Sequence, residues 1–133
     1  MEQYLNAFVE ERATHNLTII YNDMHWLWGG VTITLSATGA YERLEYQRES
    51  IIPDLRRKTV TPARIQEVIL LLRELRAWEQ QTLERTPMAD EVRATLTLRT
   101  DEVESSIWEL YNKLERNRRL VQVRRLLIDL AKE

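Results

Sequence analysis

His25 and Asp23 are the residues best suited by type to acid–base chemistry. They lie two apart, and alternate residues of a strand share a face, so the carboxylate is placed to orient the imidazole as a general base or metal ligand. A lone pair without a third partner is more often structural, which is what we expect here. The only other histidine, His15, lies in or beside the first predicted helix. Two histidines without a spacing motif, in a chain without cysteine, predict no metal site and no cofactor.

Carboxylates also occur in adjacent pairs, at Asp90-Glu91 and Asp101-Glu102. Neighbours in a strand point to opposite faces and neighbours in a turn are solvated, so these pairs are expected to be surface charges. The chain has only three glycines, with no glycine-rich phosphate loop and no serine in a nucleophile-elbow context. No catalytic residue is assigned on these grounds.

Arg76 and Glu79 lie three apart at the end of a predicted central helix, on the side of its apolar stripe. One interpretation is a polar pocket where the helix overhangs a sheet, with Trp78 beside the pair and Tyr41 and Arg43 as wall residues. The other, which we favour, is a partly exposed salt bridge beyond the rim of the sheet. If the first interpretation is right, the protein is a small-molecule-binding protein or enzyme with a cleft near the C-terminal end of this helix. This is our alternative functional hypothesis.

Trp26 and Trp28 share a face if their segment is extended, and they immediately precede Gly29-Gly30, the strongest turn signal in the chain. Large aromatic side chains at an exposed loop tip are candidates for an interface or ligand contact. The competing interpretation, to which we give more weight, is packing beneath the first helix.

The last predicted helix is rich in arginine, and Arg118 and Arg125 share its outward face. Together with the triplet Arg56-Arg57-Lys58 they form the one surface suited to phosphate contacts. The formal net charge is −2, and the arginines ring the helix instead of forming one strip. We therefore expect a solvated, salt-bridged face and no nucleic-acid partner.

Length and composition indicate one globular domain over residues 1–133, because 44% of the residues are hydrophobic and 30% charged. The first residues lack the basic and apolar regions of a signal peptide, and no apolar run approaches the roughly 20 residues of a membrane span. The expectation is a soluble, cytoplasmic protein with no membrane partner.

The segment 61–80 organises the predicted fold because its start, period and length all indicate a helix. Thr61 can cap the first free amides, and Pro62 suits the first helical position. Apolar residues then recur at the spacing of a core-facing stripe, at Ile65, Val68, Ile69, Leu72 and Leu75.

A hairpin followed by a helix is predicted twice, after a short N-terminal helix over residues 1–15. The first hairpin–helix half covers 17–81 and the second 90–132, without residue-by-residue identity between them. Alternating or β-rich patterns place strands near 17–21, 31–37, 41–46, 92–99 and 103–110. The segment 47–60 reads as a loop, and residues 112–131 as one helix.

The two principal helices each carry a second, minor apolar stripe with seven-residue spacing. These stripes are Leu114/Val121/Ile128 and Ala63/Leu70/Ala77. Such a stripe lies on a flank of the helix, so we expect the two helices side by side on one sheet. The predicted fold class is α+β, a two-layer sandwich with an antiparallel sheet of about four to five strands and both helices on one face.

The leading functional hypothesis is a non-enzymatic protein-interaction module that self-associates as a homodimer. The minor apolar stripes exceed what one sheet face can bury. A threonine-rich sheet face needs water, a ligand or another chain to cover it, and its members are Thr32, Thr34, Thr95 and Thr97.

Overall fold

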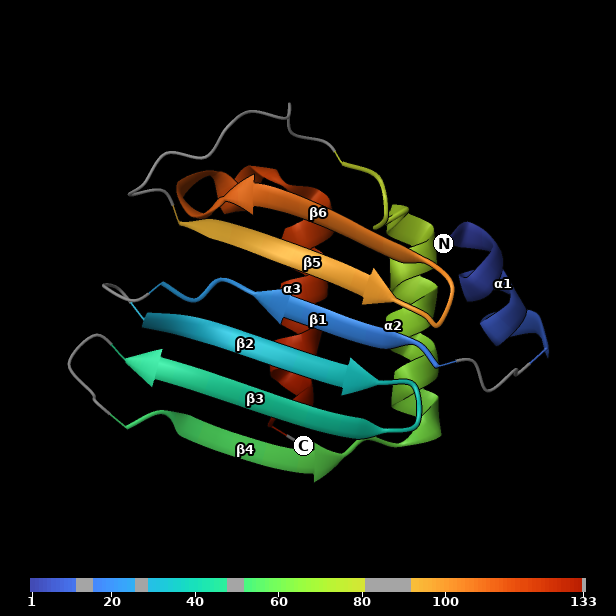
Figure 1. Cartoon of the computed structure of the whole chain (residues 1–133), viewed down its shortest axis with the longest axis horizontal. Coiled ribbons are helices and arrows are strands. Elements are labelled where there is room, and N and C mark those ends of the chain that lie inside the picture. Colours follow the sequence, from blue (N-terminus) through green and yellow to red (C-terminus); the bar gives the residue numbers. More distant parts are fainter. Residues whose placement is uncertain (12–15, 26–28, 48–51, 81–91, 133) are drawn as a thin grey trace.

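The computed structural model describes residues 1–11, 16–25, 29–47, 52–80 and 92–132. The helices and strands follow in chain order as α1 (Glu2–Glu11), β1 (Thr18–Asn22), β2 (Gly29–Ser36), β3 (Ala40–Gln47), β4 (Asp54–Thr59), α2 (Pro62–Leu75), β5 (Arg93–Arg99), β6 (Glu104–Leu110), the 3-10 helix η1 (Tyr111–Arg116) and α3 (Arg118–Leu130). Figure 1 shows the sheet in front of α2 and α3, which confirms the predicted α+β sandwich. None of the helices in the described ranges is long and apolar enough to cross a membrane.

The sheet has six antiparallel strands in the order β4-β3-β2-β1-β5-β6, one or two more than expected. The additional strand is β4, which lies inside the segment predicted to be a loop. It pairs with β3 from Ala40↔Thr59 to Glu45↔Asp54. Consequently β3 is an interior strand, and β4 forms the edge.

The turn between β2 and β3 requires glycine. Gly39 has a φ of +105°, and its amide donates to the main-chain oxygen of Ser36 at 2.9 Å. A Cβ at this position would lie 2.8 Å from the main-chain oxygen of Val60, which follows β4. The turn therefore fixes both the hairpin and the approach of β4 to the start of α2.

Helix α2 begins as predicted and ends earlier. The Thr61 side chain accepts a hydrogen bond from the Arg64 amide, and Pro62 occupies the first turn. The helix ends at Leu75 because Arg76 adopts a left-handed conformation with a φ of 51°. All five members of the predicted stripe are buried: Ile65, Val68, Ile69, Leu72 and Leu75.

The predicted helix over 112–131 is divided by Asn117. Its side chain accepts from the Leu120 amide at 3.2 Å and so caps α3. The Glu109 side chain is 8% exposed and accepts from Asn117 Nδ2 at 3.4 Å. A carboxylate in this place also opposes the positive end of the α3 dipole.

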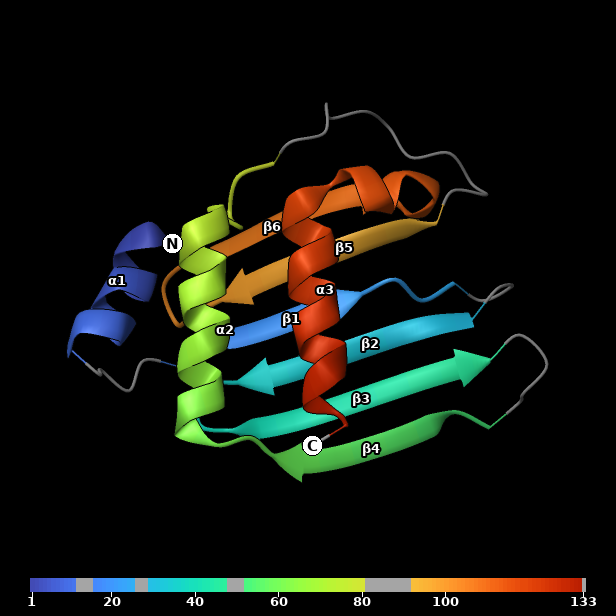
Figure 2. The ribbon, with the colours of Figure 1, turned by 180° about the vertical axis from the view of Figure 1, so that it is seen from behind.

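The helices lie side by side, but not through the minor stripes. Figure 2 shows α2 between α1 and α3 on one face of the sheet. The side of α3 that meets α2 carries Arg119, whose guanidinium donates to the main-chain oxygens of Leu75 at 2.7 Å and Glu79 at 2.8 Å. On α2, Leu70 is 38% exposed and Ala63 is exposed. Ala77 is buried, but the other two members of the Ala63/Leu70/Ala77 stripe are exposed to solvent, so the last helix does not cover the stripe as a whole in the way we predicted.

Candidate functional site

A buried charge network joins the end of β1 to α3. Asp23 is 2% exposed, and its Oδ2 accepts from the Tyr21 hydroxyl at 2.8 Å and from Arg124 Nε at 3.1 Å. Its Oδ1 accepts from the Val31 amide at 2.8 Å. The carboxylate thus has three donors from β1, β2 and α3, as a buried charge requires.

Local sequence patterns place each member of this network. Alternation along β1 carries Ile19 and Tyr21 toward the helices, and Asp23 continues that period. Gly30 has a φ of +131°, and a Cβ there would lie 2.6 Å from the Asp23 main-chain oxygen and 2.9 Å from its Oδ1. Gly30 therefore admits the carboxylate to its position. Arg124 is adjacent to the buried Val123 on α3, so its side chain leaves the helix beside the core.

The pKa shifts of the network follow from burial and pairing. Burial raises the pKa of Tyr21, and Asp23 raises it further, while Arg124 opposes the shift. Burial alone would lower the pKa of Arg124, but its hydrogen bond to Asp23 and the nearby oxygens of Tyr21, Asp23 and Tyr111 raise it overall. At neutral pH the network holds an uncharged phenol and a charged guanidinium.

The Arg124 guanidinium forms part of the wall of a groove beside α3. The groove encloses about 380 Å³. Its apolar lining comes from η1 and from the flank of α3 that faces away from α2, and comprises Tyr111, Leu114, Val121 and Ile128. Tyr111 is 49% exposed, while Leu114 is 8% exposed. The rim carries charges of both signs, with Arg125 and Lys132 opposed by Glu115 and Asp129. We name this feature the η1–α3 groove.

The sequence indicated this groove only in part. The Leu114/Val121/Ile128 stripe was expected to meet α2, but it lines the groove together with Tyr111, which sequence reasoning had not singled out for this position. The Asp23–Arg124 pair was also missed, since its members lie 101 residues apart. Two features of the sequence could have indicated the pair. Asp23 continues the alternation of buried residues along β1, and Arg124 lies next to the core stripe of α3.

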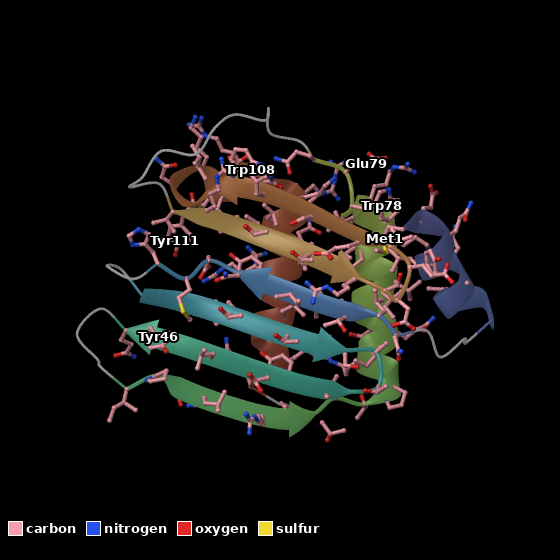
Figure 3. All side chains as sticks on the ribbon, in the orientation of Figure 1. Met1, Tyr46, Trp78, Glu79, Trp108 and Tyr111 are labelled. Carbon is pink, nitrogen blue, oxygen red and sulfur yellow. The ribbon has the colours of Figure 1, made fainter. Side chains whose placement is uncertain are left out.

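Arg76 and Glu79 form the salt bridge that we favoured. Arg76 Nε donates to Glu79 Oε1 at 2.8 Å, and the side chains are 49% and 42% exposed. Hydrogen bonding to Glu79 raises the pKa of Arg76, and the same bond lowers the pKa of Glu79. The Arg76 guanidinium lies 5.3 Å from the centroid of the Trp78 ring and 3.6 Å from Glu2 of α1. In Figure 3, Trp78 and Glu79 lie at the same end of the molecule as Met1, far from Tyr46 and Tyr111.

The structure does not join the proposed wall residues to this pair. The Tyr41 hydroxyl donates to the main-chain oxygen of Leu127 at 2.8 Å, beneath α3. Arg43 pairs with Glu45 along β3, at 2.5 Å between Nη2 and Oε2. These contacts place both residues in the β3–α3 part of the fold, whereas α2 ends near β6 (Figure 2).

The structure does not bring the remaining candidate residues together in one site. Trp26 and Trp28 lie outside the described residues, so their predicted role stays a prediction. Arg118 is exposed at the start of α3, and Arg125 lies on the rim of the η1–α3 groove. His25 pairs with Gly29 through two main-chain hydrogen bonds. In the described ranges, no group of three or more His, Cys, Asp or Glu side chains is arranged to hold a metal ion.

Stability should fall at alkaline pH, and Tyr41 contributes to this fall together with Tyr21. Burial raises the pKa of Tyr41 to about 12 against an ordinary value of 10.0, and Arg43 opposes the shift. The folded state thus holds the phenolic proton more tightly than the unfolded chain does, so this contribution is complete below pH 10 and is lost as pH rises toward 12. Two pKa units correspond to about 2–3 kcal/mol. The free energy of unfolding, measured with urea at several pH values in this range, should show the decline. It should fall less steeply with pH for Tyr41→Phe. Equal slopes for the two proteins would contradict the assignment.

No protein-family model matches the chain, and no curated protein is significantly similar to it in sequence.

Proposed function

We propose that the protein is a non-enzymatic interaction module that self-associates through the η1–α3 groove. The observation that carries the proposal is the half-exposed Tyr111 side chain, which lines the groove together with the apolar side chains of Val121 and Ile128. Aromatic side chains at the centre of a concave apolar surface are the usual anchors of protein interfaces.

The Asp23 network makes one wall of the groove rigid. Arg124 is fixed by its hydrogen bond to the buried carboxylate, and its guanidinium lies 5.9 Å from the centroid of the Tyr21 ring. A side chain that is already ordered loses little entropy when a partner binds. The wall is therefore prepared for association before a second chain arrives.

Charge complementarity favours a second copy as the partner. In a two-fold dimer the same patch meets itself, so the patch must offer both signs of charge. The groove rim does so, with Arg125 and Lys132 beside Glu115 and Asp129. The existing Lys132–Asp129 pair is 3.6 Å long with both side chains at least half exposed. An exposed pair of this kind is worth little, so exchanging it across an interface costs little.

Ile128→Glu should weaken self-association at least tenfold, because it places an unpaired charge among the apolar side chains of the groove. Sedimentation equilibrium over a range of protein concentrations measures the change. Tyr111→Ala should weaken association as well, and because Tyr111 is 49% exposed its removal leaves the core intact.

Leu70→Glu is the matched control, since Leu70 is an exposed leucine on the outward side of α2. It should leave the dissociation constant unchanged. A wild-type protein that remains monomeric at high concentration would refute self-association. Dissociation caused by Leu70→Glu and not by Ile128→Glu would move the interface away from the groove.

A further inference from the structure

The two edge strands of the sheet, β6 and β4, differ in whether a side chain satisfies their outward main-chain groups. At β6 the Gln80 side chain acts as a substitute strand: its Nε2 donates to the Trp108 main-chain oxygen at 2.8 Å, and its Oε1 accepts from the Trp108 amide at 2.7 Å. Both outward main-chain groups of this residue are therefore satisfied. At the other end of the strand order, β4 pairs with β3 on one side and is the last strand of the described sheet. An edge strand of this kind is a template for pairing with another chain.

The side chains of β4 combine positive charge with exposure. Arg56 and Arg57 are 63% and 71% exposed, and their ion pairs, to Asp54 at 3.3 Å and to Glu42 at 3.0 Å, have partners that are also half exposed. Such pairs are weak in water. The guanidinium groups are thus available to exchange onto carboxylates of a bound chain.

Cross-strand neighbours strengthen the demand for negative charge at this edge. Arg56 lies directly opposite Arg43 in the β3–β4 register. Like charges in directly opposed positions destabilise a sheet. Each arginine has a carboxylate on its own strand, Glu45 for Arg43 and Asp54 for Arg56, and an acidic residue across the edge from Arg56 would add a further one.

The edge also has apolar contacts to offer. Leu55 is 45% exposed and lies opposite Leu44 on the open face of the sheet. A cavity of about 430 Å³ runs along β4 and is lined by Tyr41, Leu55, Arg56, Arg57, Lys58 and Ala131. An added strand would extend the Leu44–Leu55 row and cover part of this cavity.

We infer that β4 binds an extended acidic segment of a partner protein as a seventh, antiparallel strand. This surface is separate from the η1–α3 groove and serves a different partner. A second copy of the chain is a poor occupant, because pairing β4 with itself would bring two Arg56-Arg57-Lys58 triplets together. Main-chain hydrogen bonds would supply affinity, and the side chains facing the triplet would supply specificity.

The register predicts the pattern of the bound segment. Read from its N-terminus, an antiparallel strand meets Thr59, Lys58, Arg57, Arg56, Leu55 and Asp54 in that order. Acidic residues opposite Arg57 and Arg56, an apolar residue opposite Leu55 and a basic residue opposite Asp54 match these positions. A third acidic residue lies opposite Lys58, whose Nζ also donates to the main-chain oxygen of Leu130 at 2.7 Å. A fluorescent peptide of sequence Thr-Glu-Glu-Glu-Ile-Lys is the corresponding probe.

Fluorescence anisotropy of the intact protein should show saturable binding of this probe that weakens with salt. Arg57→Glu should weaken binding at least tenfold, and a probe with lysine as its middle acidic residue should restore binding to that variant. Arg118→Glu, an exposed arginine on α3, is the matched control and should bind the original probe as the wild type does. Ile128→Glu should also bind normally, which separates this result from the test of self-association.

Main-chain pairing is tested by N-methylation, because only alternate amides of an added strand face β4. Two probes methylated at the two alternating sets of positions should differ at least tenfold in affinity. Equal affinities of the two methylated probes would show that charge alone attracts the probe, and would overturn the inference. The same conclusion would follow if an unstructured polyanion, such as a single-stranded RNA, displaced the probe as well as the unlabelled peptide does. Absence of binding at low salt, or equal loss with Arg118→Glu, would overturn it as well.

Discussion

Replacing Asp23 by alanine should lower the free energy of unfolding by about 3–5 kcal/mol, the usual cost of removing one partner from a buried ion pair. The carboxylate is 2% exposed and accepts from Tyr21, Val31 and Arg124. Without it, the phenol and the main-chain amide lose their acceptor in a site that water barely reaches, and the guanidinium, whose side chain is 32% exposed, loses its ion-pair partner. Urea unfolding monitored by circular dichroism at neutral pH measures the loss.

Two further variants distinguish a charge effect from a packing effect. Asp23→Asn keeps an acceptor oxygen and the side-chain volume, so it should retain part of the stability that alanine loses. The double variant Asp23→Ala, Arg124→Met has no unpaired guanidinium. Its loss of unfolding free energy should therefore be smaller than the sum of the losses in the two single variants. A loss below about 1 kcal/mol for Asp23→Ala would contradict the expected effect and would mean that the pair contributes little to stability.

The Asp23 network also links stability to the groove. Arg124 is positioned by Asp23, and its guanidinium forms one wall of the η1–α3 groove. Loosening this side chain would raise the entropy lost on association. The same residue that ties α3 to the sheet thus prepares the surface on which we place self-association.

Interior strands were predictable from sequence because their alternation is set by burial on one face. Along β2 the buried and partly exposed positions alternate without interruption, and the threonines occupy the open face as expected. β4 has no such alternation of apolar and polar residues. Its six residues are Asp-Leu-Arg-Arg-Lys-Thr, and only Lys58 is partly buried. An edge strand beyond the helices has no core face to fill, so its composition resembles that of a loop.

Helix ends and long-range polar pairs were less accessible for separate reasons. The α2 helix stops where Arg76 takes a left-handed conformation, and arginine gives no signal for that conformation as glycine or asparagine would. Asn117 did provide a capping signal within the last helix, and the apolar period on either side of it concealed the break. The Asp23–Arg124 pair depends on where α3 crosses the sheet, which periodicity within either element does not specify.

The second large effect contrasts two leucines of the same helix. Leu72 is 0% exposed and Leu70 is 38% exposed, although both occupy apolar stripes in the sequence. Leu72→Ala should lower the free energy of unfolding by about 2–5 kcal/mol, because it removes buried methyl groups and leaves a cavity between α2 and the sheet. Leu70→Ala removes the same atoms from a position that is 38% exposed and should cost clearly less, about 1 kcal/mol or below.

Helix propensity cancels in this comparison, since both variants replace leucine with alanine in the interior of α2. Urea unfolding should give the same dependence on denaturant for both proteins and a lower midpoint for Leu72→Ala than for Leu70→Ala. Equal losses would mean that Leu70 is covered in solution, and the candidate cover would then be a second chain on the outward side of α2. In that case Leu70→Glu would cease to be a neutral control, and association would have to be assigned to the α2 surface in place of the η1–α3 groove.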